Sequence, residues 1–263
     1  MPASMTPLIS ISDLIHESWV FFKNDWKAIV KRNAWMILVM VAFYPLYMGG
    51  IAMESTLMIL LGALVLCVGM LFVTLHAMRY VLAKDGGQIA QATQGKTLSQ
   101  LFVPAFLIAL LSWLAGMGGM VLFIIPGIWF IIAAGQAIAV YLEEGTTGTN
   151  AIARSMDLVK GRWWKTLWRT IFPALVFQII IGIISFAIYI VPVVFAIIGG
   201  AAAIMSFSEG GSAGLSAASL PMLIIAGLLF IVATVANLLL SLVGTGLSQV
   251  VSAKLFHSLK ASR

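Results

Sequence analysis

Four polar side chains interrupt the long apolar segments that make up most of this sequence: His76, Gln136, Gln178 and Asn237. An amide or imidazole among apolar residues needs a hydrogen-bond partner, because leaving it unpaired costs free energy. Such residues either bond one helix to another or line a polar pocket. Both alternatives are open here, and in the second Arg79 lies at the mouth of the pocket.

The sequence contains none of the common signatures of catalysis or nucleotide binding. It has no glycine-rich phosphate loop, no His-Glu-x-x-His and no Cys-x-x-Cys. The three histidines, His16, His76 and His257, lie far apart, and the single cysteine, Cys67, cannot form an intramolecular disulfide. We therefore expect no metal, no cofactor and no catalytic residue.

The composition shows which solvent most of the chain requires. Hydrophobic residues make up 62% of the sequence and charged residues only 9%, whereas soluble domains carry about 45–50% and about 25%. So few charges cannot cover the surface of a soluble protein, so lipid is the natural solvent. The net charge of +6 comes from basic residues that flank apolar runs. They predict contact with lipid headgroups, and no nucleic acid is expected as a partner.

Six apolar segments are long enough to cross a bilayer, whose hydrocarbon core takes about 20 helical residues. The predicted spans lie near residues 34–53, 57–82, 101–117, 120–142, 171–205 and 221–250. The pattern predicts an all-α fold, a polytopic membrane helical bundle in which residues 1–263 form a single integral membrane domain. The glycine-rich stretch 115–119 predicts a tight hairpin. Pro192 and Gly199-Gly200 interrupt the fifth segment, which is either one kinked helix or a span followed by a half-helix.

Lysine and arginine occur on only one side of the predicted six-span arrangement. The N-terminal segment, the end of the second span with its loop, the loop after the fourth span and the C-terminal tail contain all of them, and the other loops contain Glu54 and Glu209. By the positive-inside rule, both termini are cytoplasmic. We therefore expect a multi-pass protein of the bacterial plasma (inner) membrane.

Two basic segments, 12–32 and 149–169, have the pattern of amphipathic helices that lie in the cytoplasmic membrane interface. Their apolar residues recur at helical spacing, with tryptophan and lysine at the edges of the stripe. Ser12 is the predicted N-cap of the first helix. The expected lipid contacts are Trp19, Lys23, Trp26, Lys27, Lys160, Trp163, Trp164 and Lys165. The expected partners are membrane lipids, with anionic headgroups on the cytoplasmic side.

The orientation of the spans sets the depth of the polar residues. At about 1.5 Å per residue, His76 and Gln136 lie about 9 Å below the cytoplasmic interface, Gln178 about 12 Å deep and Asn237 near the midplane. With Arg79 they form one candidate pocket that opens to the cytoplasmic leaflet. No Asp or Glu lies in the middle of a predicted span, which argues against an ion-driven transporter.

The middle third of the chain carries a recognisable pattern. Ile125-Pro126-Gly127-Ile128 is followed by Val140-Tyr141-Leu142-Glu143-Glu144-Gly145 and by Ala151-Ile152-Ala153-Arg154-Ser155-Met156-Asp157-Leu158-Val159-Lys160-Gly161. This resembles the uncharacterised bacterial inner-membrane family that includes the YciC protein. It is also similar to the membrane domain attached to some glycerophosphoryl diester phosphodiesterases. The resemblance implies a fold and a membrane location. It implies almost nothing about activity, because the family's role is not established. A phosphodiesterase activity is not expected, because the catalytic part of such enzymes is a separate soluble barrel for which no residues remain here.

These observations favour a non-enzymatic role in membrane organisation, envelope homeostasis or accessory assembly with a protein partner whose identity the sequence does not give. The alternative is a passive transporter or exporter of lipids or small amphiphiles. A membrane-embedded lipid-modifying enzyme is the least favoured class. A continuous polar path would favour transport, and a packed interior would favour the interaction role.

Overall fold

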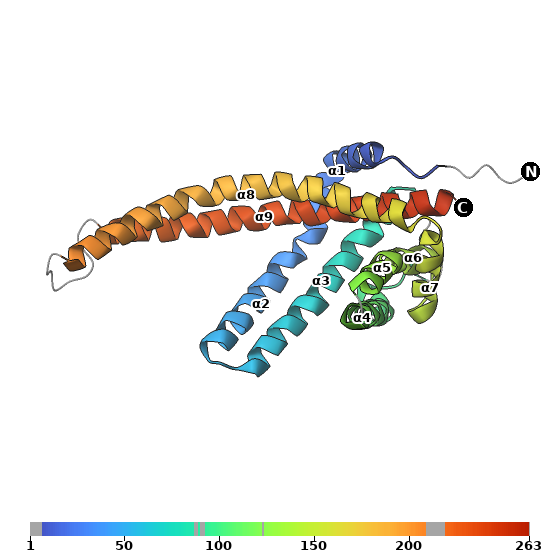
Figure 1. The fold of residues 1–263 in the computed structure, drawn as a ribbon, viewed down its shortest axis with the longest axis horizontal. Coiled ribbons are helices and arrows are strands. Elements are labelled where there is room, and N and C mark those ends of the chain that lie inside the picture. The colour runs from blue at the N-terminus through green and yellow to red at the C-terminus, as the bar shows by residue number, and fades with distance from the viewer. Residues whose placement is uncertain (1–6, 87–88, 90–92, 123, 209–218, 263) are drawn as a thin grey trace, which may run out of the picture. The chain divides into compact units, whose positions relative to one another are not determined.

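A computed structural model describes residues 7–86, 89, 93–122, 124–208 and 219–262. These residues form helices and contain no β-strand, which confirms the all-α prediction. The helices are α1 (Ile11–Asn33), α2 (Trp35–Ala52), α3 (Thr56–Lys84), α4 (Leu98–Leu122), α5 (Ile124–Ala134), α6 (Ala137–Glu144), α7 (Gly148–Val159), α8 (Trp163–Ser208) and α9 (Ser219–Ala261) (Figure 1). Six helical segments of the described residues are long and apolar enough to cross a membrane, which indicates a multi-pass membrane protein.

The chain divides into two compact units. The first contains Met1–Leu175 and Thr245–Arg263, and the second contains Val176–Gly244. The first unit therefore holds α1 to α7, the beginning of α8 and the end of α9. The second unit consists of the remaining parts of α8 and α9.

Helix α1 begins at Ile11, one residue before its predicted N-cap, Ser12. The Ser10 hydroxyl, rather than that of Ser12, accepts a hydrogen bond of 3.0 Å from the backbone N–H of Asp13. A serine oxygen in this position satisfies one of the unpaired N–H groups of the first turn. Asp13 in the first turn and Lys31 in the last turn also match the dipole of the helix.

Within the first unit, α2 pairs with α3 and α4 pairs with α5 as helical hairpins (Figure 1). The second hairpin does not turn at 115–119 as predicted, because α4 continues to Leu122. The glycines in this stretch serve close packing instead. A Cβ added at Gly119 would lie 2.9 Å from Gly127 Cα, and one added at Gly127 would lie 2.6 Å from the backbone nitrogen of Met120. Only glycine permits this approach of the two backbones.

The second basic amphipathic segment forms two helices rather than the single predicted helix over 149–169. Helix α7 ends at Val159 and α8 begins at Trp163. Between them Gly161 has a φ of 77°, a left-handed conformation that favours glycine. The chain therefore changes direction at this glycine, immediately before the long apolar helix.

The second unit is a hairpin of two apolar helices. The rings of Tyr189 and Phe230 pack with centroids 5.5 Å apart, and the Tyr189 hydroxyl donates to Thr234 Oγ1 at 3.4 Å. Helix α8 passes Pro192 and Gly199-Gly200 as one continuous helix, so the structure favours the single-helix alternative. Helices α8 and α9 have 46 and 43 residues. Since about 20 residues cross a hydrocarbon core, only part of each can lie within it.

The C-terminal part of α9 lies in the core of the first unit. Val250, Leu255, Phe256 and Leu259 are almost fully buried, although they lie on different sides of the helix. Buried apolar area stabilises by about 25 cal/mol per Å². This packing fixes the charged residues between them, which point into the candidate site.

Candidate functional site

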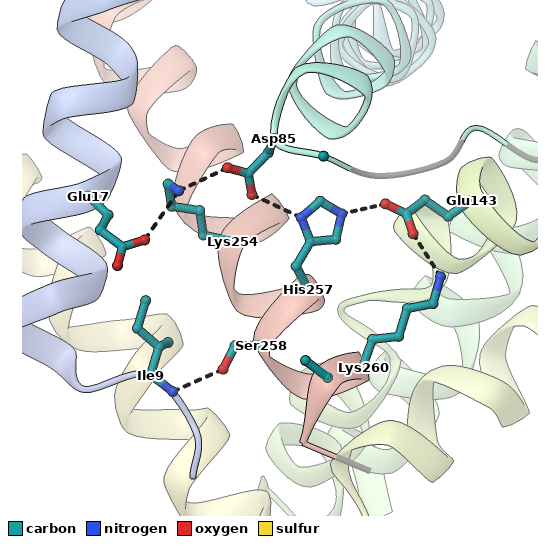
Figure 2. Close-up of a pocket in the computed structure, with 10 residues that line it drawn as sticks. Ile9, Glu17, Asp85, Glu143, Lys254, His257, Ser258 and Lys260 are labelled. Carbon is teal, nitrogen blue, oxygen red and sulfur yellow. Dashed lines mark hydrogen bonds and ion pairs between the residues drawn. The ribbon is translucent and has the colours of Figure 1, made fainter. Parts of the chain in front are cut away.

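Three basic side chains of α9 meet three carboxylates that come from other elements of the first unit. Lys254, His257 and Lys260 are three residues apart and therefore lie along one side of the helix. Together with Glu17, Asp85 and Glu143, they line a cavity of about 660 Å³. Figure 2 shows how these side chains lie around it. The carboxylates belong to α1, to the residue that follows α3, and to α6.

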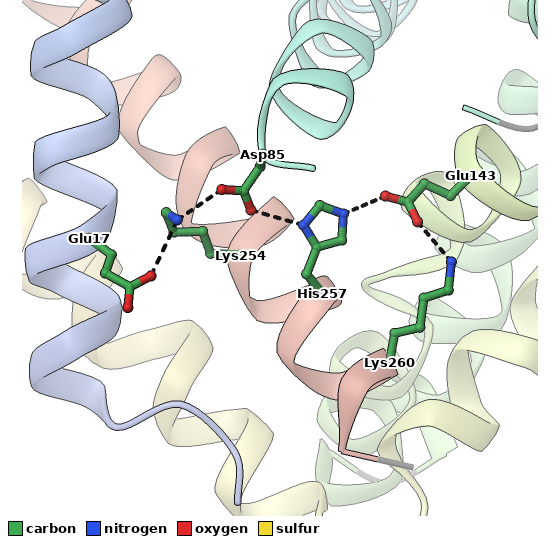
Figure 3. A network of polar contacts seen from close by, with 6 residues as sticks. All are labelled: Glu17, Asp85, Glu143, Lys254, His257 and Lys260. Atoms are coloured by element: carbon green, nitrogen blue, oxygen red, sulfur yellow. Dashed lines mark hydrogen bonds and ion pairs between the residues drawn. The ribbon is translucent and has the colours of Figure 1, made fainter. Parts of the chain in front are cut away.

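The six side chains form a continuous series of ion pairs with alternating charge, here called the His257 network (Figure 3). Lys254 Nζ donates to Glu17 Oε2 at 3.3 Å and to Asp85 Oδ1 at 2.8 Å. His257 Nδ1 lies 2.9 Å from Asp85 Oδ2, and its Nε2 contacts Glu143 Oε1. Lys260 Nζ donates to Glu143 Oε2 at 2.9 Å.

Both nitrogens of His257 face a carboxylate oxygen. A neutral imidazole carries only one N–H group, so a ring that donates from both nitrogens is the charged imidazolium. Burial alone would raise the pKa of Asp85, but hydrogen bonds from His257 and Lys254, together with their charges, lower that pKa below its ordinary value. The His257 network thus contains three cations and three carboxylates, and its formal charges cancel.

The burial of Glu143 shows what the His257 network does for the fold. Its side chain is only 1% exposed, and it contacts two cations, His257 and Lys260. A buried carboxylate is costly unless it is paired, and removing one partner destabilises strongly. The His257 network therefore fastens α1, the end of α3 and α6 to α9.

The N-terminal segment is attached at the same place. The backbone N–H of Ile9 donates to Ser258 Oγ at 2.9 Å, and the carbonyl of Ile9 accepts from Arg169 Nε at 2.6 Å. Within the described part of the chain, no group of three His, Cys, Asp or Glu side chains is placed to hold a metal ion. The cavity is thus bordered by mutually paired charges.

Two residues of the predicted polar pocket make other contacts in the first unit. Gln136 is buried, and its Oε1 accepts from Ser252 Oγ at 3.4 Å, beside a cavity of about 250 Å³. Arg79 donates to the backbone carbonyls of Lys96 at 2.8 Å and of Thr93 at 3.4 Å. Arg79 therefore attaches the segment between α3 and α4, a contact that the sequence does not predict.

The other three residues lie in different environments. His76 is half-buried on α3 in the first unit, while Gln178 and Asn237 belong to the second unit. Asn237 is half-buried, whereas Gln178 is exposed. One cavity shared by all the residues of the predicted pocket stays a prediction.

The predicted apolar stripe of α1 divides into two faces. Phe22 and Ile29 are buried, at 5% and 0% exposed, whereas Trp19 and Trp26 are 49% and 48% exposed. Trp19, Lys23, Trp26 and Lys27 are all exposed and are here called the tryptophan–lysine face of α1. The helix is therefore held by one side while its aromatic and basic side chains point outward.

The lipid contacts predicted around the start of α8 are only partly exposed. Lys160, Trp164 and Lys165 are exposed, whereas Trp163 is half-buried. Its indole N–H donates to the carbonyl of Trp129 at 3.1 Å.

The recognisable motif in the middle third makes structural contacts. The buried Ser155 hydroxyl donates to the carbonyl of Ala133 at 2.7 Å and accepts from the N–H of Gln136 at 3.2 Å, where α5 ends and α6 begins. Arg154 Nε donates to Glu144 Oε2 at 2.9 Å, and this hydrogen bond raises the pKa of Arg154. The motif thus holds α7 against α5 and α6.

Comparison with family models, with curated proteins and with solved structures gives no match for the chain. The family resemblance of the middle third therefore stays a prediction.

Proposed function

We propose that this chain is a non-enzymatic protein of the bacterial inner membrane that organises the membrane by binding anionic lipid headgroups on its cytoplasmic side. The tryptophan–lysine face of α1 is the observation that carries the proposal. Phe22 and Ile29 are buried on an adjacent side of the helix in the first unit, while Trp19 and Lys23 are exposed. Tryptophan prefers the headgroup region, and lysine attracts anionic lipids.

The His257 network supports this role because it holds the lipid-binding helix in place. Glu17 of α1 pairs with Lys254, and the buried amides of Asn33 and Gln249 exchange two hydrogen bonds of 3.1 Å between α1 and α9. Both carboxylates nearest His257 are already paired with cations. A general acid or base instead needs a group within reach of a substrate proton, so the arrangement favours a structural role over catalysis.

Passive transport of lipids or small amphiphiles is the second candidate. It is favoured by the cavity beside Gln136, which Thr170, Ser248 and Ser252 also line. Polar side chains among membrane helices commonly mark a binding site or a path. Movement of a fluorescent lipid between the leaflets of liposomes, faster with the reconstituted protein than without it, would favour transport over organisation.

The lipid-binding proposal is tested with full-length protein released from detergent micelles into a mass spectrometer under native conditions. With added phosphatidylglycerol, the double variant Lys23→Gln/Lys27→Gln should bind at least about fivefold more weakly than wild type, since each basic residue near a surface contributes about 1 kcal/mol. The matched control is Lys96→Gln, another exposed lysine, and should bind like wild type. Wild-type affinity in the double variant would overturn the proposal.

A further inference from the structure

A cavity of about 320 Å³ lies in the first unit at the junction of α7 and α8, and its residues are absent from the His257 network. It is lined by Trp129, Ala133, Met156, Asp157, Val159, Lys160, Gly161 and Trp163, and is here called the aromatic pocket. Its walls come from α5, α7 and the turn that leads into α8.

Two tryptophans form the apolar walls, and one of them is held firmly. The hydrogen bond from Trp163 to the carbonyl of Trp129 joins α8 to α5. The Trp163 ring also packs edge-on against Trp164, with centroids 4.8 Å apart and planes at 80°. Tryptophan faces attract organic cations, and Met156 adds a polarizable surface beside them.

One residue of each charge borders the same pocket. Asp157 and Lys160 are both exposed, and the backbone N–H of Lys160 donates to the carbonyl of Asp157 at 3.1 Å, which keeps them in one turn. Asp157 also interacts electrostatically with Arg154, so a bound ammonium would share this carboxylate with a guanidinium. A ligand that carries both charges can satisfy Asp157 and Lys160 together.

We propose that the aromatic pocket binds the phosphoethanolamine headgroup of a zwitterionic phospholipid. The ammonium lies between Asp157 and the rings of Trp129 and Trp163, and the phosphate faces Lys160. A purely anionic headgroup is repelled by Asp157, whereas the tryptophan–lysine face of α1 contains two lysines and no carboxylate. The inference rests on the proposed function in that the start of α8 must contact lipid.

The test titrates full-length protein in detergent with phosphatidylethanolamine, phosphatidylglycerol and soluble phosphoethanolamine, and reads bound ligand by native mass spectrometry. Asp157→Asn should weaken phosphatidylethanolamine binding about fivefold or more and should not weaken phosphatidylglycerol binding. Trp129→Leu should give a similar loss, and Trp129→Phe should recover most of it. Glu54→Gln removes an exposed carboxylate elsewhere and should behave like wild type.

The outcomes separate this site from the lipid-binding face of α1. Binding of soluble phosphoethanolamine that depends on Asp157 supports the headgroup chemistry and assigns a soluble source, while binding of the phospholipid alone assigns a lipid. Wild-type phosphatidylethanolamine binding in both Asp157→Asn and Trp129→Leu would overturn the site. If Lys23→Gln/Lys27→Gln still loses phosphatidylglycerol in that case, the proposed function stands without the aromatic pocket.

Discussion

Replacing His257 with alanine should destabilise the protein by about 2–3 kcal/mol. The change removes a 2.9 Å contact with Asp85 and the contact with Glu143. Hydrogen bonds to charged groups contribute about 1.5–3 kcal/mol each. Both carboxylates keep one lysine partner, at 2.8 Å and 2.9 Å. The loss is therefore smaller than the sum of two full contacts and below the cost of leaving a buried charge alone, about 3–5 kcal/mol.

The assay is equilibrium unfolding of the full-length protein in mixed micelles with increasing sodium dodecyl sulfate, followed by tryptophan fluorescence. His16→Ala is the matched control, because His16 is an exposed histidine on α1 and its loss should change the free energy of unfolding by less than about 0.5 kcal/mol. His257→Gln keeps one donor group and should fall between alanine and wild type. If His257→Ala unfolds at the wild-type midpoint, the His257 network does not hold the helices together.

Asp85→Asn should destabilise the protein at pH 7, and its difference from wild type should shrink below about pH 4. Because the pKa of Asp85 is lower in the folded state than in the unfolded state, the ionised carboxylate stabilises the fold at any pH above its unfolded-state pKa. This stabilisation is lost as the pH falls through the folded-state pKa, so unfolding midpoints at pH 7 and pH 3 measure it. Asn33→Leu leaves the buried amide of Gln249 unpaired and should lower the free energy of unfolding by about 1–3 kcal/mol. In a double-mutant cycle, the double variant Asn33→Leu/Gln249→Leu should lose less stability than the sum of the losses in the two single variants. Reporter fusions at Gly148 and Glu54 should report the cytoplasm and the outside, and the same side for both would contradict the topology.

The long helices follow closely from the sequence. Apolar residues occupy nearly every position of 34–53 and 57–82, and the polar pair Glu54-Ser55 separates them, where the structure has α2 and α3. Glycine is harder to interpret, because it serves both turns and close helix packing. The stretch 115–119 predicts a turn, yet Gly119 lies against α5 within a helix.

The His257 network is not predictable from one sequence. The spacing of Lys254, His257 and Lys260 along one side of a helix is a visible signal, but their partners lie 114 to 237 residues away along the chain. Pairing them requires the three-dimensional arrangement of α1, α3, α6 and α9. The polar residues within the spans are easy to find in the sequence because each interrupts an apolar run. Their local environments nevertheless differ, since Gln136 is buried and Gln178 is exposed.

The depth of α1 in the membrane shows most directly whether its tryptophan–lysine face binds lipid headgroups. Variants that retain only Trp19 or only Trp26, with phenylalanine at the other tryptophan positions, are reconstituted into liposomes of brominated lipids, and a tryptophan-free variant gives the background. The tryptophan–lysine face of α1 predicts stronger quenching by bromine near the headgroup than by bromine near the chain end. Quenching mainly by the deep bromine, or none from either lipid, would show that this face does not lie among the headgroups.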